Sequence, residues 1–208
     1  MTPGFFITFE GADGSGKTTQ LARLAAWCRE QGYQVTLTRE PGGTPTAERI
    51  RSLVLEPGLT IDTKTEALLY LAARAEHVAQ VIKPALEAGQ IVLCDRFADS
   101  TLVYQGLTRG LGLETMTQLN AFAAGGIKPQ LTFVLDGAPE LLAERRAKRG
   151  VEDRFELEGL EFQQQVRAGF LTLAQAEPER IKLIEALRPV DEVTEAILQQ
   201  VKAVLLHR

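Results

Sequence analysis

Residues 11–18 read Gly-Ala-Asp-Gly-Ser-Gly-Lys-Thr, which is a complete G-x-x-x-x-G-K-[ST] phosphate-binding loop. The loop lies between an apolar run over residues 5–9 and a helix-like stretch. Its glycines let successive backbone N–H groups point inward at phosphates, and the following helix adds the positive end of its dipole. A tight strand-to-helix turn alone would not need Lys and Thr directly after the last glycine. We therefore interpret this stretch as a nucleotide-binding site.

Short β-type runs alternate with longer helical patterns along the rest of the chain. Three of the runs are apolar throughout, which is typical of parallel strands covered on both faces. The sequence therefore predicts an α/β fold of the P-loop NTPase type, a doubly wound sheet of five parallel strands flanked by helices. The expected strands are residues 5–10, 34–39, 91–95, 131–136 and 181–184, and the expected helices are residues 17–31, 46–55, 64–88, 113–124, 139–149, 158–176 and 190–206.

The length of 208 residues and the 45% hydrophobic content fit a single domain over residues 1–208. The formal net charge is −4 and both signs are evenly spread, so we expect no nucleic-acid partner. No uninterrupted apolar stretch approaches the roughly 20 residues that cross a bilayer, so we expect no membrane partner. Cys28 and Cys94 lie in apolar patterns typical of reduced, buried packing residues. These features together favour a cytoplasmic protein.

Polar residues at the carboxyl ends of parallel strands converge on the ligand in such folds. We expect Lys17 to reach the β- and γ-phosphates and the Thr18 hydroxyl to ligate Mg²⁺. Asp95 ends the third strand, where an acid holds the water shell of Mg²⁺. The alternative is that Asp95 caps the next helix. Arg96 offers a two-pronged donor for a second phosphate, which points to an acceptor phosphate as well as ATP.

The segment over residues 144–154 contains five basic side chains. Arg145 and Arg149 lie one turn apart on one predicted helix face, and Gly150 ends the helix before a short polar loop. Arginines that arrive on closure would stabilise the charge of phosphoryl transfer, so we interpret about residues 145–158 as an arginine-rich lid. A solvated helix face is the alternative. Arg145, Arg149 and Arg154 all qualify as the lid arginine, and Arg149 is favoured before Arg154.

Several motifs carry a specific resemblance across nearly the whole chain. They are the phosphate-binding loop after Phe9-Glu10, the stretch Thr38-Arg39-Glu40-Pro41-Gly42-Gly43-Thr44, Asp95-Arg96-Phe97 followed by Ser100 and Tyr104-Gln105-Gly106, and the arginine-rich segment. In this order and spacing the chain resembles bacterial thymidylate kinase, of the P-loop nucleoside monophosphate kinase family. The resemblance implies transfer of the ATP γ-phosphate to dTMP to give dTDP, with Mg²⁺, in a homodimer.

The resemblance also assigns roles to individual residues. Arg96 would hold the dTMP phosphate with help from Arg51, and Asp13 would approach the sugar 3′-hydroxyl or keep a metal-bound water in place. Tyr70 would stack on thymine, and Arg74, which is one turn further along a helix, would bond a base carbonyl. Gln105 would bond the base edge, Tyr104 would lie under the sugar and Ser100 would support the base contacts. The family places a proline after the second strand whose preceding bond is cis in some members, here Glu40-Pro41.

The expected site residues fall into four groups. The catalytic group is Lys17, Arg96, Arg149, Arg154 and Asp13, and the ATP-binding group is Gly11, Ala12, Asp13, Gly14, Ser15, Gly16, Lys17, Thr18, Thr19 and Arg145. The substrate-binding group is Glu10, Arg51, Tyr70, Arg74, Arg96, Ser100, Tyr104 and Gln105, and the metal group is Thr18 and Asp95.

Three alternatives stay open at this stage. On spacing alone, Tyr70 could be a core residue and Arg74 a surface charge. A kinase for another nucleotide or a deoxynucleoside is the nearest rival function, since Glu10 could act on a hydroxyl, although a neutral sugar leaves Arg96 without a phosphate. A regulatory NTP-binding module is a third possibility, but the chain has no Asn-Lys-x-Asp segment to read guanine. The choice between dTMP and dUMP also stays open, because one methyl group contributes only about 1–3 kcal/mol.

Overall fold

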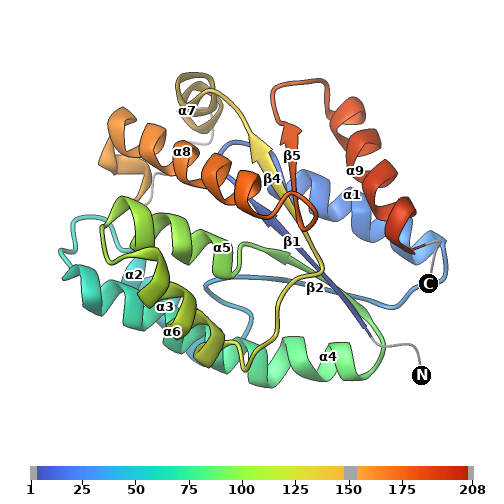
Figure 1. Cartoon of the computed structure of the whole chain (residues 1–208), viewed down its shortest axis with the longest axis horizontal. Helices are drawn as coiled ribbons and strands as arrows, with labels where there is room; N and C mark the ends of the chain where they lie inside the picture. The colour runs from blue at the N-terminus through green and yellow to red at the C-terminus, as the bar shows by residue number, and fades with distance from the viewer. Residues whose placement is uncertain (1–3, 148–153, 206–208) are drawn as a thin grey trace.

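The computed structural model describes residues 4–147 and 154–205. Its centre is a five-stranded parallel sheet in the order β2-β3-β1-β4-β5 (Figure 1). The strands are β1 (Phe5–Glu10), β2 (Val35–Arg39), β3 (Ile91–Asp95), β4 (Leu131–Asp136) and β5 (Ile181–Glu185). The predicted fold class and the position of all five strands are thereby confirmed, with bounds that differ by one residue at most.

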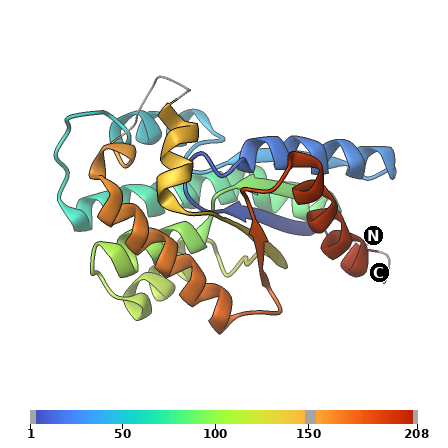
Figure 2. The same ribbon diagram turned by 90° about the horizontal axis from the view of Figure 1, so that it is seen from above.

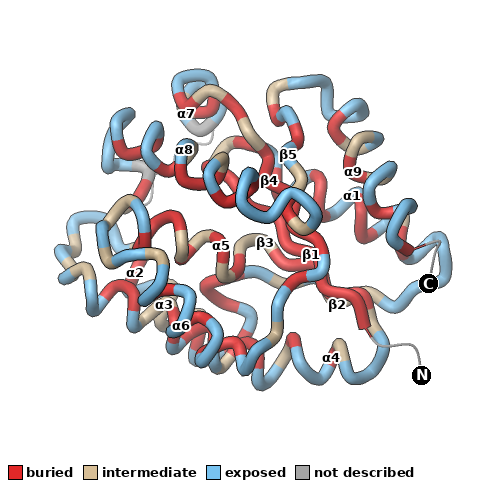
Figure 3. Tube along the Cα trace, viewed as in Figure 1, coloured by how far each residue is buried: buried red, intermediate tan, exposed pale blue. Residues whose placement is uncertain are grey.

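Helices cover both faces of the sheet because alternate strand residues point to opposite sides. The face that carries Phe5, Ile7 and Phe9 packs against α1 (Lys17–Glu30) and α9 (Val190–Leu205). The opposite face carries Phe6 and Val134 and packs against helices that include α8 (Leu160–Ala176). Seen from above, α1 and α8 lie on opposite sides of the strands (Figure 2). The sheet is therefore buried throughout its centre, where the tube in Figure 3 is red.

The remaining helices surround the carboxyl ends of the strands and the second face. They are α2 (Pro45–Val54), α3 (Thr63–His77), α4 (Lys83–Glu87), α5 (Ala98–Thr101), α6 (Leu113–Ala123) and α7 (Pro139–Ala147), with the π-helical segments η1 (Val78–Ile82) and η2 (Leu102–Thr108) and the 3₁₀ turn η3 (Glu156–Glu158). Within these residues, no helix is long and apolar enough to cross a bilayer. Cys28 and Cys94 are buried free thiols, as predicted.

Two helical stretches differ from the prediction. The single helix expected over residues 64–88 is interrupted by η1, so a π turn separates α3 from α4. A second stretch, α5 with η2, has no counterpart among the predicted elements. Gly106 lies inside it, and glycine lowers helix propensity by about 1 kcal/mol, so local sequence favours no helix there. Tertiary packing of Val103 and Tyr104 against α8 overrides that preference.

Candidate active site

The phosphate-binding loop follows β1 and turns sharply because glycine occupies its strained positions. Gly11 has φ +118°, and a Cβ at this position would lie 2.5 Å from the carbonyl oxygen of Leu135. Gly16 has φ +93° and precedes the first residue of α1. Ser15 contributes a buried hydroxyl with no hydrogen-bond partner among the described residues. The loop thus wraps a compact space at the amino end of a 14-residue helix, where backbone N–H groups attract anions.

Lys17 points back into this loop and is only 6% exposed. Its Nζ donates to the carbonyl oxygens of Gly11 and Ala12, both at 3.1 Å, and lies 3.4 Å from Asp13 Oδ1. Burial lowers the pKa of Lys17, and the nearby Arg96 charge lowers it further. A buried ammonium group with this geometry is poised to exchange loop carbonyls for phosphate oxygens.

Asp95 and Thr18 meet beside the loop. The Thr18 hydroxyl donates to Asp95 Oδ2 at 3.4 Å, while Asp95 Oδ1 is buried without a partner among the described residues. The helix-capping alternative for Asp95 is wrong, because the residue before α5 is Phe97. Nowhere in residues 4–147 and 154–205 do three or more His, Cys, Asp or Glu side chains form a metal cluster. A hydroxyl next to an unsatisfied carboxylate oxygen fits Mg²⁺, which usually keeps several waters and one or two carboxylates.

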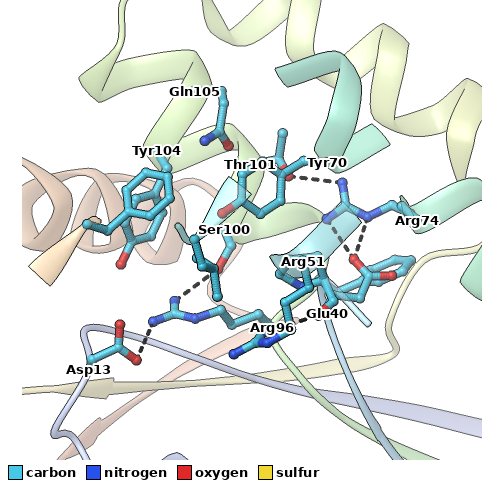
Figure 4. Close-up of a pocket in the computed structure, with 14 residues that line it drawn as sticks. Asp13, Glu40, Arg51, Tyr70, Arg74, Arg96, Ser100, Thr101, Tyr104 and Gln105 are labelled. Carbon is cyan, nitrogen blue, oxygen red and sulfur yellow. Dashed lines mark hydrogen bonds and ion pairs between the residues drawn. The ribbon is translucent and has the colours of Figure 1, made fainter. Parts of the chain in front are cut away.

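A pocket opens next to the loop, between α2, α3, α5 and η2 (Figure 4). It is lined mainly by polar and aromatic side chains, which come from six separate segments. The lining residues are Asp13, Glu40, Pro41, Arg51, Leu55, Tyr70, Arg74, Arg96, Phe97, Ser100, Thr101, Tyr104, Gln105 and Phe155.

Arg96 extends across this pocket toward the phosphate-binding loop. Its backbone is left-handed, with φ +66°, which is uncommon for a residue with a side chain and is often found at functional sites. Its Nη2 donates to Asp13 Oδ1 at 2.9 Å, its Nη1 donates to the Ser100 hydroxyl at 3.2 Å, and its guanidinium lies over the Tyr104 ring. Burial alone would raise the pKa of Asp13, but the charges of Arg96 and Lys17 outweigh it and lower the pKa below its usual range.

Glu10 lies beneath the pocket at the end of β1. Its oxygens accept from the Phe97 N–H at 2.8 Å and from the Ser100 hydroxyl at 2.5 Å. Burial, followed by the charge of Asp99, raises the pKa of Glu10 to about 8. Glu10 therefore shapes the segment that carries Arg96 and Ser100, and it is not itself among the lining residues.

Arg74 reaches the pocket from α3 and is only 2% exposed. Its Nε and Nη2 contact Glu40 Oε2 at 2.8 Å, and its Nη1 donates to Thr101 at 3.0 Å and to Asn120. Glu40 also contacts His77 Nδ1 at 3.0 Å. The surface-charge alternative for Arg74 is therefore wrong. The Glu40-Pro41 bond, whose isomer the sequence alone could not decide, is cis.

The comparisons with known proteins agree on one family. A family model described as thymidylate kinase matches residues 9–197. The thymidylate kinase of Deinococcus radiodurans is 53% identical over 93% of this chain and 94% of its own length, and that of Symbiobacterium thermophilum is 50% identical over 98% and 95%. The crystal structure of thymidylate kinase from Ehrlichia chaffeensis superposes with a TM-score of 0.79 at 35% identity, covering 96% of this chain and 100% of that one.

The chain belongs to the thymidylate kinase family.

Most of the expected substrate-binding residues meet in one pocket. Seven of the eight line it, and only Glu10 lies below. Tyr70 packs its ring against Phe155 at 6.2 Å, and Arg51 donates to the Pro41 carbonyl at 3.1 Å. The seven are Arg51, Tyr70, Arg74, Arg96, Ser100, Tyr104 and Gln105.

The expected lid residues that the structure describes lie outside this pocket. Arg145 donates to the carbonyls of Ala186 and Leu187 after β5. Arg154 donates to the Val54 carbonyl at 3.0 Å and to Glu66 at 2.5 Å, on the side of α2 and α3. Arg149 lies outside the described residues.

Some residues in or behind the pocket are not predicted from the sequence. Leu55, Thr101 and Phe155 line the pocket, and Glu66 bonds Gln105 from behind it. None of them lies in a quoted motif: Leu55 and Phe155 reach the site through tertiary packing, whereas Thr101 directly follows Ser100 on α5. The one available signal was for Glu66, an acidic residue four positions before Tyr70 on the same predicted helix.

Proposed function

We propose that this chain transfers the γ-phosphate of ATP to dTMP to give dTDP, in the presence of Mg²⁺. One observation carries the proposal: the Asp13 carboxylate lies 2.9 Å from Arg96 and 3.4 Å from Lys17. Lys17 in the phosphate-binding loop and Arg96 in the neighbouring pocket therefore contact the same carboxylate, that of Asp13. Two phosphate-binding cations this close together suit the in-line transfer of a phosphoryl group from one phosphate to another.

The charges available suit a phosphate acceptor better than a sugar hydroxyl. A phosphate monoester has its second pKa near 6, so it is largely dianionic at pH 7 and already nucleophilic. Catalysis then needs alignment and charge stabilisation, which Lys17 could supply on the donor side and Arg96 on the acceptor side. A deoxynucleoside kinase would need a carboxylate aimed at a hydroxyl. Glu10 is instead bonded to the Phe97 N–H and to Ser100 beneath the pocket.

The base-binding end of the pocket combines an aromatic ring with directed polar groups. Tyr70 lines it and meets the Phe155 ring edge-on at 67°, and an aromatic ring of this kind is suited to stack on a flat base. Arg74 and Gln105 line the same end, and Arg74 is held rigid by Glu40, Thr101 and Asn120. Burial raises the pKa of Tyr104 to about 12, so its hydroxyl stays neutral under the sugar. This arrangement supports a pyrimidine deoxynucleotide as acceptor.

Thr18 and Asp95 are the residues that would hold Mg²⁺. When bound beside the loop, this ion neutralises charge on the β- and γ-phosphates of ATP. Asp95 Oδ1, which has no hydrogen-bond partner among the residues that the structure describes, supports this assignment.

Arg145, Arg149 and Arg154 remain our candidates for the lid cations that stabilise the transferred group. In this structure Arg154 contacts Glu66 and the Val54 carbonyl, so a role at the donor phosphates would require these contacts to break. Arg149 stays the first choice on sequence grounds.

We also infer a cytoplasmic homodimer. Helices α3 and α6 pack side by side and expose apolar side chains: Leu68 is 59% exposed, Phe122 87% and Leu119 36%. Adjacent exposed apolar residues of this size are typical of a surface that meets a partner. A second copy of the chain is the simplest partner. Light scattering should give twice the chain mass for the wild type and a monomer for Phe122→Glu.

The test of function is ADP formation from Mg-ATP with purified protein, offered dTMP, dUMP, dCMP, dGMP, AMP, UMP and thymidine in parallel. We expect strong turnover with dTMP, weak turnover with dUMP and none with thymidine, with dTDP identified by mass. Turnover of thymidine but not dTMP would contradict the acceptor-phosphate role of Arg96. No ADP formation with any compound of the panel would contradict the proposed reaction.

A further inference from the structure

Glu66 is a buried acid on α3 that is not used by the reaction proposed above. It is 1% exposed, and both of its carboxylate oxygens are occupied. Oε1 accepts from Gln105 Nε2 at 2.8 Å, and Oε2 accepts from Arg154 Nη2 at 2.5 Å. Arg109 Nε lies 3.6 Å from Oε1. Glu66 therefore lies directly behind the pocket wall to which Gln105 belongs.

The carboxylate of Glu66 decides which end of the Gln105 amide faces the pocket. An ionised carboxylate has acceptors only, so the Gln105 atom beside it must be the NH₂ group. The carbonyl oxygen Oε1 is then left on the pocket side, where it makes no hydrogen bond within the described residues (Figure 4). Gln105 is only 2% exposed, so little solvent competes for this oxygen. The pocket wall thus presents an acceptor at this position.

An acceptor at the base edge selects among pyrimidines. Thymine and uracil carry a hydrogen on N3 and can donate there, whereas neutral cytosine has a lone pair on N3. A cytosine edge would place an acceptor against an acceptor, and a buried polar group left unpaired costs more than the bond itself contributes. Binding sites that discriminate by hydrogen bonds reject the wrong partner more strongly than apolar pockets do.

We propose that Glu66 is a positioning residue that fixes the Gln105 amide with its oxygen toward the pocket, and so selects pyrimidine nucleotides with an N3–H over cytidine nucleotides. The proposal rests on the proposed function, because it names how the acceptor base of that site is chosen. Glu66 acts through Gln105 and does not touch the substrate itself.

The surroundings of Glu66 hold it in place for this task. Arg154 is tied to the Val54 carbonyl at 3.0 Å, and its guanidinium lies over the Phe155 ring. Arg109 lies over the Phe155 and Phe162 rings and also pairs with Glu158. Both arginines that flank Glu66 are held by further contacts in this structure, and Arg109 would still face the carboxylate if Arg154 moved to the donor phosphates.

The test compares kcat/KM for dTMP with kcat/KM for dCMP in the wild type and in Glu66→Gln. A glutamine at this position can donate as well as accept, so the Gln105 amide is free to turn over. We expect the dTMP-to-dCMP ratio to fall by roughly tenfold, the size of one hydrogen-bond difference. Glu158→Gln is the matched control, since it alters an acid of the same cluster that does not touch Gln105, and its ratio should stay unchanged.

Two further variants separate positioning from simple stabilisation. Gln105→Leu should lower the ratio on its own, and adding Glu66→Gln to it should change the ratio no further. An equal loss of kcat/KM for both nucleotides in Glu66→Gln would overturn the proposal, as would a further fall in the double variant. If Glu66→Gln does not fold, an unchanged ratio in Gln105→Leu overturns it and a lowered ratio supports it. Wild-type protein that turns over no nucleotide would contradict the proposed function instead.

Discussion

The phosphate-binding loop and the neighbouring pocket are built in opposite ways. The loop is one continuous stretch whose working groups are backbone N–H groups and Lys17, with Gly11 and Gly16 in conformations that need glycine. The pocket draws its lining from six segments spread over residues 13–155 and depends on side chains held by other side chains. A local site tolerates changes in the rest of the protein, whereas a pocket of this kind depends on each supporting contact. Mutations should therefore have separable effects in the two regions.

Lys17→Met should have the largest effect, because it removes the buried cation of the donor side. Removing one preorganised charge from a transition state costs about 10²–10³ in rate, so we expect kcat to fall by roughly 10³. The KM for dTMP should change by no more than about threefold. Steady-state kinetics of ADP release would measure both. Lys83→Met, which changes an exposed lysine, is the control. A large rise in the KM for dTMP would contradict the separation of the two regions.

Arg96→Met tests the same separation from the pocket side. Loss of a charged, two-pronged donor should lower kcat/KM for dTMP by about 10², with little change in the affinity for ATP. Arg96→Lys should recover part of the loss, since it keeps the charge but not the forked geometry. Isothermal titration with each nucleotide would separate the effects. An equal weakening of ATP and dTMP binding would mean that Arg96 serves both sites.

Glu40→Gln probes how far the pocket depends on its supporting contacts. Glu40 is 4% exposed and pairs with Arg74 and His77, so losing its charge should lower the free energy of unfolding by about 2 kcal/mol. Urea denaturation would measure the loss. Glu185→Gln, in an exposed pair with Arg188, should change stability by less than about 0.5 kcal/mol. Equal losses in the two variants would contradict the role of Glu40.

Glu10→Gln should give the most gradual effect, a change in the pH dependence of stability. The pKa of Glu10 is about 8 in the folded chain, against an ordinary value of 4.5, so the folded state holds an extra proton between these two pH values. Wild-type stability should then fall as pH rises from 5 to 8, by at most about 1.4 kcal/mol per pH unit from this group. The variant should lack this contribution. If the melting temperatures of the wild type and of Glu10→Gln changed equally between pH 5 and 8, the prediction would be contradicted.

The difference between the two regions also explains what the sequence could predict. The loop, the five strands and the crevice at their carboxyl ends follow from local patterns, and the structure has all three. The pocket wall does not, because Phe155 and Leu55 reach it only through tertiary packing. The helical stretch α5–η2 was missed for the same reason, since Gly106 disfavours a helix until α8 packs against it. Glu66 acts on the site only through its hydrogen bond with Gln105, and no sequence motif identifies a residue that supports a lining residue from behind.

The π-helical segment η2 has a consequence for how this chain can vary. Its hydrogen bond from the Arg109 N–H to the Tyr104 carbonyl spans five residues, so each turn contains one residue more than an α-helix. Removing one residue from Leu102–Tyr104 would move Gln105 one position along the helix, which turns its side chain by about 100°. A deletion before Gln105 would therefore turn this side chain away from the pocket, whereas a deletion after it would leave Gln105 in place. The number of residues that precede Gln105 in this segment thus determines which side chain the base-binding wall presents.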